Sequence, residues 1–325
     1  MTKLILKCSL SPGDIVMLTA AVRDLHRCHP GRFVTDVRTS CPDLWRYNPW
    51  LTPLRSDDPE VRHIECRYPL IDRANSEPWH FLHGFVQHLG GELGVSLHPT
   101  AFRGDIHLSK SEMTDPGPVE EVHGDRRPYW IIAAGGKYDF TIKWWHRRRW
   151  QEVVNRLRDE VVFVQVGEAH HYHPRLEGVV DMRGRTTLRE LVRLVYHSRG
   201  VVCPVTSLMH LAAAVPQPPD RRGERPCVVV AGAREPAHWE AYPWHRYLHT
   251  VGTLPCCASG GCWKRRSVPL GDGDCNDDPE RLCLDFDAGV GLPRCMASIE
   301  APMVIQSVRA HLPARQVQPI TIYHE

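Results

Sequence analysis

The stretch SLSPGDIVMLTAAVRDL (9–25) places an acidic side chain where a strand gives way to a helix. A Pro-Gly turn follows the predicted strand, and Asp14 stands where the helix begins. One interpretation is an N-cap, in which the Asp14 carboxylate accepts hydrogen bonds from free backbone N–H groups. The other is a general base facing a cleft, because α/β proteins bind their ligands at the carboxyl ends of parallel strands.

A second junction of this kind lies in GVVCPVTSLMHLAAAV (200–215), where a strand runs directly into a helix. The first turn of that helix carries Thr206, Ser207 and His210. Free N–H groups and hydroxyls at a helix start bind phosphate, but Ser and Thr are also ordinary capping residues. The pattern is consistent with a phosphate site and with simple capping.

A third junction, GGKYDFTIKWWHRRRW (135–150), carries Lys137 and Lys143 between a strand and a helix. Either lysine could reach a phosphate, and the alternative is a solvated basic surface. The basic character here is local, as it is in KRR (264–266).

Cysteines are concentrated near the end of the chain, in CCASGGC (256–262) and at Cys275, Cys283 and Cys295. A catalytic thiol would need an activating base and an oxyanion pocket, and nothing around this stretch indicates either. Disulfides are uncommon in the cytoplasm, which is the compartment that we expect. A tetrahedral site of four thiolates is the remaining interpretation, and a metal ion would hold the apolar-poor segment 263–294 where a hydrophobic core cannot.

The sequence predicts that one structural ion is bound by Cys257, Cys262, Cys283 and Cys295. Two glycines between Cys257 and Cys262 let the chain wrap around an ion. Neighbouring cysteines cannot easily both face one ion, so Cys256 is the alternative to Cys257. Thiolates alone do not distinguish iron from zinc.

The bulk composition bounds the class of protein. With 325 residues, 42% of them hydrophobic, the chain is long enough for two domains of ordinary size. A net charge of +2 argues against nucleic-acid binding, which needs a broader basic surface. No apolar run is long enough for a membrane span, and Pro12, Gly13 and Asp14 interrupt the first one too early for a signal peptide. We therefore expect a cytoplasmic protein.

Short β-branched runs alternate with amphipathic segments along most of the chain, which is typical of parallel sheets covered by helices. In the first part the predicted strands are 4–10, 32–39, 63–70 and 104–109, and the predicted helices are 14–30 and 78–95. Residues 112–128, rich in Pro, Gly and charge, are predicted to be a linker. The later strands are 129–136, 161–167, 178–184, 200–205 and 226–232, with helices at 146–160, 186–198 and 207–215. The pattern predicts two doubly wound, Rossmann-like domains, 1–115 and 116–325, facing a cleft, with a Cys-rich loop at 256–295.

Several of these segments resemble glycosyltransferase family 9, the heptosyltransferases that use ADP-heptose. GDIVMLTAAVRDLHRCHPG resembles the opening of the family, and GVVCPVTSLMHLAAAVPQP is similar to its strand–helix motif. REPAHWEAYPWHRYLH with LPCC, and later LPRCMASIEAPMVIQSVRAHL, resemble its C-terminal end. VTSLMH and the Cys-bearing tail are most similar to the bacterial autotransporter heptosyltransferases, a branch that glycosylates protein hydroxyls and carries a cysteine-coordinated iron finger.

The resemblance implies a GT-B fold and an inverting transfer without a catalytic metal, with the acceptor on the N-terminal domain and the nucleotide-sugar on the C-terminal one. Asp14 matches the proposed base of the family, Lys143 a lysine that offsets charge on the diphosphate, and Glu168 an acidic residue that binds the ribose. The diphosphate-binding helix start is matched by Thr206, Ser207, Leu208 and His210. A final helix at 301–312 is expected to pack near the domain junction.

One position departs from the family, which often has an acidic residue where this chain has Val205. That residue often contacts hydroxyls of the donor sugar, so ADP is better supported than heptose. The expected function is transfer of a sugar, heptose in the first instance, from an ADP-sugar to a hydroxyl of a protein, a saccharide or a small molecule. The alternatives are a transferase that uses another nucleotide-sugar and a non-catalytic Cys-metal module that binds a protein or nucleic acid. The sequence leaves a homo-oligomer open.

Overall fold

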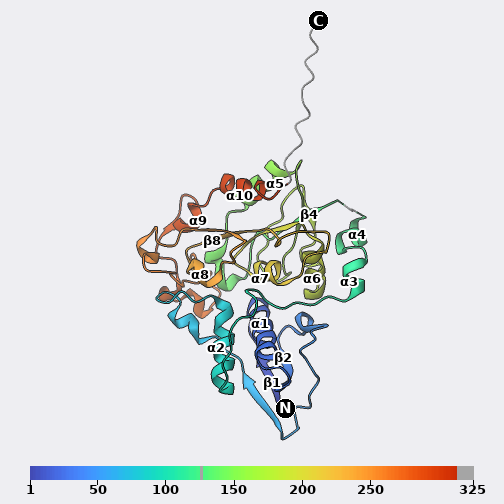
Figure 1. Cartoon of the computed structure of the whole chain (residues 1–325). Coiled ribbons are helices and arrows are strands. Elements are labelled where there is room, and N and C mark those ends of the chain that lie inside the picture. The colour runs from blue at the N-terminus through green and yellow to red at the C-terminus, as the bar shows by residue number, and fades with distance from the viewer. Residues whose placement is uncertain (125–126, 313–325) are drawn as a thin grey trace, which may run out of the picture.

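The computed structural model describes residues 1–124 and 127–312, and two parallel sheets divide it into two α/β units (Figure 1). The N-terminal unit, residues 1–109, is drawn in blue below the larger C-terminal unit, residues 110–312. The predicted α/β fold with parallel sheets is confirmed.

The N-terminal sheet has three parallel strands in the order β2-β1-β3. They are β1 (Thr2–Cys8), β2 (Phe33–Thr39) and β3 (Val61–Glu65), and the helices are α1 (Pro12–Cys28) and α2 (Phe81–Leu93). Leu4 and Leu6 of β1 share one hydrophobic core with both helices, whereas Lys3 and Lys7 on the opposite side of the strand are partly exposed. The unit has three paired strands where the sequence predicts four.

Residues 104–109 were expected to form a closing strand, and this prediction is wrong. The segment crosses α1 instead, where the Asp105 N–H donates to the Thr19 hydroxyl over 2.8 Å. A Cβ on Gly104 would lie 2.6 Å from Val16 Cγ1 and 2.8 Å from Ala214 Cβ. Its backbone is thus packed between two helices rather than paired in a sheet.

The predicted linker 112–128 contains two short helices, α3 (Lys110–Thr114) and α4 (Pro118–His123), which pack against α6 (Leu188–His197) of the C-terminal unit. A capping box starts α3: the Ser109 hydroxyl accepts from the Glu112 N–H and the Glu112 carboxylate accepts from the Ser109 N–H. The predicted boundary at 115/116 falls between these two helices. The linker was predicted from the Pro, Gly and charged residues of the segment, and that prediction did not take the capping pair Ser109 and Glu112 into account.

The C-terminal sheet has six parallel strands in the order β6-β5-β4-β7-β8-β9. The strands are β4 (Tyr129–Ile132), β5 (Val162–Gln165), β6 (Val180–Asp181), β7 (Gly200–Pro204), β8 (Cys227–Gly232) and β9 (Arg246–His249). From β4, successive strands are added on one side as far as β6, and from β7 onward they are added on the other side. Dinucleotide-binding folds have the same reversal of strand order, and their ligands lie in the crevice beyond that point. We call the space beyond the carboxyl ends of β4 and β7 the switch crevice.

Helices cover both faces of this sheet, because alternate residues of β4 belong to different cores. Tyr129 and Ile131 pack with α6 and with α7 (Ser207–Ala214), and Trp130 and Ile132 pack with α5 (Arg147–Leu157) and α10 (Ala301–Arg309). The final helix α10 thus lies against α5, far from the N-terminal unit (Figure 1). The expectation that it packs near the domain junction is wrong.

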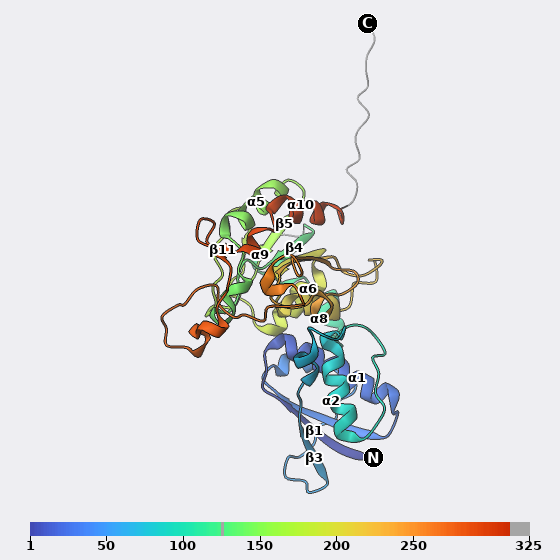
Figure 2. The same ribbon diagram turned by 90° about the vertical axis from the view of Figure 1, so that its left-hand side faces the viewer.

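The Cys-rich loop, residues 256–295, projects from the side of the C-terminal unit, where Figure 2 shows it in orange. It contains the hairpin of β10 (Phe286–Asp287) and β11 (Leu292–Pro293), and α8 (Ala237–Glu240) precedes it and α9 (Arg294–Ala297) closes it. Apart from the hairpin and a few short 3-10 helices, most of this loop has no regular structure.

The short 3-10 helices of the chain are η1 (Pro42–Trp45), η2 (Pro69–Arg73), η3 (Tyr138–Lys143), η4 (Pro255–Cys257), η5 (Cys275–Asp277) and η6 (Pro279–Arg281).

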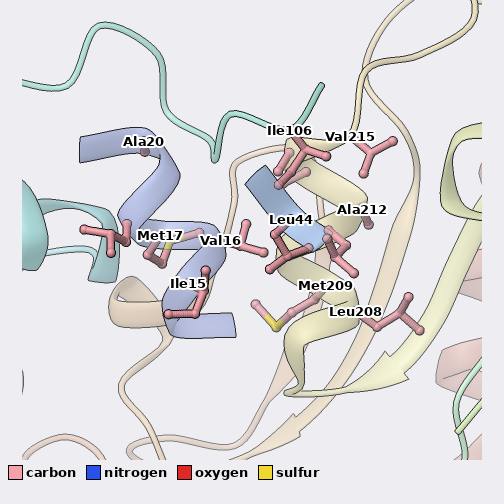
Figure 3. Packing of buried hydrophobic residues seen from close by; sticks show 14 of the residues in the cluster. Ile15, Val16, Met17, Ala20, Leu44, Ile106, Leu208, Met209, Ala212 and Val215 are labelled. Carbon is pink, nitrogen blue, oxygen red and sulfur yellow. The ribbon is translucent and has the colours of Figure 1, made fainter. Parts of the chain in front are cut away.

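Helix α1 of the N-terminal unit packs directly against α7 of the C-terminal unit (Figure 3). Gly13 of α1 lies next to Ser207 and His210 of α7, and Val16 is on the side of α1 that faces α7. The buried apolar residues of both helices belong to one cluster, together with Leu44 and Ile106. The two units therefore share one continuous hydrophobic core. This contact sets how the start of α1 lies relative to the start of α7.

Candidate active site

Four neighbouring strands of the C-terminal sheet deliver polar residues to the same edge. In the spatial order β5-β4-β7-β8, the residues that follow the strands are Glu168, Lys143, Thr206 with Ser207, and Arg234 with Glu235. Carboxyl ends of parallel strands meet at one edge, so these residues border the switch crevice. Arg234 and Glu235 were not among the residues predicted from the sequence.

Asp14 reaches this edge from the other unit. It lies in the first turn of α1, and Ser11, the N-cap of α1, makes no side-chain capping bond. A Cβ at the preceding Gly13 would lie 3.2 Å from His210 Cδ2 and 3.5 Å from Ser207 Cα, which shows how closely the starts of α1 and α7 approach. Lys137 adds a second contact between the units by donating to the Ser11 hydroxyl over 2.8 Å.

Burial raises the pKa of the Asp14 carboxyl, and a hydrogen bond from the Tyr68 hydroxyl, followed by the charge of His210, offsets part of this rise. Glu240 adds to the rise. A raised pKa brings a carboxylate closer to the range where it accepts protons at neutral pH. These surroundings are compatible with a carboxylate that accepts a proton.

Tyr68 is fixed by an aromatic cluster that spans both units. Its ring centroid lies 4.7 Å from that of Phe81, 5.2 Å from that of Phe85 and 6.5 Å from that of Trp239. Close approach of α2 is possible because Gly84 has no side chain, since a Cβ there would lie 2.6 Å from Tyr68 Cβ. Tyr68 lies in the segment predicted as a third strand, so its contact with Asp14 could not be foreseen.

At the start of α7, Thr206 is the N-cap, and its hydroxyl accepts from the Leu208 N–H over 3.3 Å. The Leu208 side chain is 3% exposed and belongs to the core, so only its backbone could meet a ligand. His210 is also buried: Nδ1 lies 2.9 Å from the Tyr242 hydroxyl and Nε2 lies 3.1 Å from a Glu240 oxygen. In this arrangement His210 could contact a phosphate only by giving up one of these partners.

Lys143 lies beside the buried carboxylate of Glu235, with Nζ 2.5 Å from Oε1. Arg234 pairs with the same oxygen. Burial by itself would raise the pKa of Glu235, but Arg234 and Lys143 hold it below its ordinary value, so this carboxyl is ionised. One negative charge is thus shared by two cations at the edge of the switch crevice.

Glu168 follows β5, and half of its side chain is exposed. One oxygen accepts from the His170 N–H over 3.1 Å and lies 3.4 Å from His171 Nδ1. The carboxylate is therefore oriented by its own loop while remaining accessible. This is the environment expected of a group that hydrogen-bonds a ligand hydroxyl.

The thiols of the Cys-rich loop are near one another, but among the described residues no three His, Cys, Asp or Glu side chains are arranged to hold a metal ion. Burial raises the pKa of Cys262 to about 11, and the neighbouring Cys256 and Cys283 add to the rise. Burial likewise raises the pKa of Cys295 to about 12, with Cys262 and Cys283 contributing. The Cys257 side chain is buried in the core instead, where its thiol donates hydrogen bonds to the carbonyl oxygens of Thr250 and Leu254.

Two surface hollows lie elsewhere, one between η1, α3 and α6 and the other along α5. In the first, Arg189 pairs with Glu112 and Arg193 with Glu121, each over 2.5 Å. Neither hollow is lined by Asp14 or by any other predicted site residue. The candidate site is therefore located by its chemistry and by its place in the sheet.

The fold and this site define a class of α/β protein in which polar groups and helix starts lie at a strand-order reversal between two units. Residues 94–253, which include the whole six-stranded sheet, match the family model of glycosyltransferase family 9 (heptosyltransferase). The chain belongs to this family and is a glycosyltransferase. The sequence-based family assignment is thereby confirmed, and the non-catalytic alternative is set aside. A search of curated proteins found no match.

Solved structures share the fold. A family 9 glycosyltransferase from Veillonella parvula DSM 2008 is 11% identical, with a TM-score of 0.64 over 95% of this chain and 97% of that one. The iron-containing dodecameric glycosyltransferase TibC from enterotoxigenic E. coli H10407 is 18% identical, with a TM-score of 0.60 over 95% and 76%. The E. coli heptosyltransferase WaaC with ADP is 14% identical, with a TM-score of 0.53 over 77% and 94%. These likenesses support a GT-B type of architecture.

In the part of the chain that the structure describes, none of the helices has the length and apolar character needed to cross a bilayer.

The hydrogen bond from Tyr68 predicts how Asp14 titrates. Replacing Tyr68 with Phe keeps the ring in its cluster but removes the donor that stabilises the ionised carboxylate, so the pKa of Asp14 should rise further. NMR titration of ¹³C-aspartate-labelled protein measures this directly. Tyr129→Phe is the matched control, because its buried hydroxyl donates to the Leu194 carbonyl instead. An Asp14 pKa that is unchanged in Tyr68→Phe would show that the hydroxyl does not stabilise the base.

Proposed function

We propose that the chain transfers a sugar, heptose in the first instance, from an ADP-sugar to an acceptor hydroxyl, with inversion and without a catalytic metal.

 The observation that carries the proposal is the close approach of the starts of α1 and α7, which brings Asp14 beside the switch crevice. The sequence alone also pointed to Asp14, and its surroundings support that role because burial raises its pKa. An acceptor held on the N-terminal unit would meet a donor held on the C-terminal unit at this point.

In the proposed reaction, the acceptor oxygen attacks the anomeric carbon while the Asp14 carboxylate takes its proton. A carbon–oxygen bond forms to the acceptor, the bond from the anomeric carbon to the diphosphate breaks, and its electron pair leaves with the nucleotide. Lys143 and the N–H groups at the start of α7 face the negative charge that develops on the diphosphate. Thr206 and Ser207 supply hydroxyls at the same helix start.

The donor is proposed to be an ADP-sugar, with the exposed Glu168 carboxylate on the ribose hydroxyls. Two of the similar structures support the choice, TibC in complex with ADP-D-β-D-heptose and WaaC with ADP. Val205 is 4% exposed and packs in the core, so it offers no polar group to a sugar hydroxyl. This observation favours a second candidate, a transferase that uses another nucleotide-sugar.

The acceptor is proposed to be a hydroxyl of a protein, a saccharide or a small molecule. The TM-score of 0.60 with TibC supports the autotransporter branch and, because TibC is dodecameric, a homo-oligomer. The cytoplasmic location expected from the N-terminus and the cysteines stays a prediction.

The Cys-rich loop is proposed to bind a structural iron or zinc ion, which would tie the loop down without taking part in the reaction. Iron-containing TibC supports the presence of a metal. The structure favours Cys256 over the predicted Cys257 as a ligand, together with Cys262, Cys283 and Cys295, because the Cys257 thiol is bonded within the core. The set with Cys257 stays a prediction that metal analysis can test.

Replacing Asp14 with Asn should lower kcat by about 10²- to 10⁴-fold, because the amide cannot accept the proton. Transfer is measured at saturating donor and acceptor across a range of pH. In the wild type, activity should fall as the pH drops through the raised pKa of Asp14. Asp159→Asn, at an exposed site after α5, is the control. Near-wild-type transfer by Asp14→Asn would remove Asp14 as the base.

Calorimetry with ADP, UDP and GDP tests the donor. ADP should bind at least about tenfold more tightly than the other two, since a site that hydrogen-bonds one base leaves its polar groups unpaired with another. Tighter binding of UDP or GDP would support the second candidate and overturn the ADP-sugar proposal.

Metal content of the purified chain tests the structural ion. Wild-type protein and Cys257→Ser should each hold about one iron or zinc per chain, and Cys256→Ser and Cys262→Ser should lose most of it. Elemental analysis after exhaustive dialysis is the measurement. Full metal content in Cys262→Ser would contradict the site, and loss in Cys257→Ser but not in Cys256→Ser would restore the set predicted from the sequence.

A further inference from the structure

The Cys-rich loop is attached to the residues that follow β8. The Cys262 N–H donates to the Ala233 carbonyl over 3.1 Å, and the Trp263 N–H donates to the Arg234 carbonyl over 3.0 Å. In return, Arg234 Nε donates to the Lys264 carbonyl over 2.8 Å. A Cβ on Gly261 would lie 2.4 Å from the Arg234 carbonyl oxygen, so the contact requires glycine. The loop thus holds both the backbone and the side chain of Arg234.

Two aromatic rings hold the Arg234 guanidinium in place. Its carbon Cζ lies 4.7 Å from the ring centroid of Phe140 and 5.4 Å from that of Trp263. Trp263 has a φ of 55°, a left-handed conformation that is unusual for a bulky residue. Its indole N–H donates over 2.9 Å to Asn75 of the N-terminal unit, which supports this conformation. The loop therefore presents Trp263 to Arg234 at a cost in backbone strain.

Positive charge is in excess around this point. Lys143 Nζ and Arg265 Cζ lie 5.5 Å and 5.8 Å from the same Phe140 centroid, so three cations surround one ring. Glu235 pairs with Lys143 and Arg234, while Arg265 donates to the amide oxygen of Asn276. Three positive charges face one carboxylate in a partly buried place, an arrangement that attracts an anion.

We propose that Arg234 is a second donor-binding cation, which contacts the diphosphate together with Lys143, and that the Cys-rich loop serves to position it. The proposal rests on the proposed function. Arg234 follows β8 and Lys143 follows β4, the two neighbours of β7, and both cations pair with the same Glu235 oxygen. A diphosphate at the start of α7, which follows β7, would therefore meet both of them. When the bond to the sugar breaks, the electron pair stays on a diphosphate oxygen within reach of both cations.

Binding of inorganic pyrophosphate, ADP and adenosine to Arg234→Gln tests the proposal. The variant should bind pyrophosphate and ADP about 10- to 100-fold more weakly, because a hydrogen bond to a charged group is lost. Adenosine, which has no phosphate, should bind as it does to the wild type. Arg246→Gln is the matched control, since Arg246 is exposed at the opposite end of the neighbouring strand β9. Thermal melting confirms that each variant is folded.

Trp263→Leu tests the part played by the loop. It leaves every proposed ligand-binding side chain in place but removes one of the two rings over Arg234, so ADP affinity should fall by about 3- to 10-fold with adenosine unaffected. Unchanged pyrophosphate and ADP affinity in Arg234→Gln, or an equal loss for adenosine, would overturn the role of Arg234. Unchanged ADP affinity in Trp263→Leu would overturn that of the loop. Because pyrophosphate carries no base or sugar, these results stand apart from a failure of the ADP-sugar proposal.

Discussion

The packing of α1 against α7 is the contact on which the rest of the molecule depends. It joins two sheets of unequal size into one hydrophobic core, with Val16 on the side of α1 that faces α7. Gly104 lets a connecting segment pass between the two helices, where any side chain would collide. Since both helices start at the same edge of the molecule, their packing also brings the start of α1, which carries Asp14, close to the start of α7, whose free N–H groups and hydroxyls are of the kind that bind phosphate. Stability and the candidate site therefore share a single interface.

A carboxylate lies on one side of this interface and a cluster of cations on the other, and the fold keeps the two apart. Asp14 accepts a hydrogen bond from Tyr68, whose ring packs on Phe81, and it lies near the buried pair of His210 and Glu240. The cations, in contrast, lie after β4 and β8, where Glu235 neutralises only part of their charge. A carboxylate in a low-dielectric setting gains basicity, and a partly compensated cation cluster attracts an anion. The Cys-rich loop belongs to the second side, because it contacts Arg234 directly.

Prediction from the sequence succeeded where the signal was local and repeated. Alternating β-branched and amphipathic segments located each strand from β1 to β8 to within a few residues, because a buried parallel strand and its covering helix each leave a periodic pattern. It failed at residues 104–109, which have the composition of a strand but cross a helix, and at the linker, where a capping box starts α3. At 104–109 the outcome depended on the surroundings of the segment rather than on its own residues. The start of α3, in contrast, is set by a local signal, the reciprocal capping of Ser109 and Glu112, in a segment whose overall composition is that of a linker.

The sequence by itself determined the parallel α/β class, the family, and the residues at the starts of α1 and α7, since these follow from short motifs. Only the tertiary structure decided which partners these residues have. It joined Tyr68 to Asp14, enclosed Leu208 and His210, turned Cys257 into the core and brought Arg234 beside Lys143. Except for the local contacts of Cys257, these contacts link segments far apart in the chain, and their geometry is set by helix packing and strand order, which no local pattern encodes.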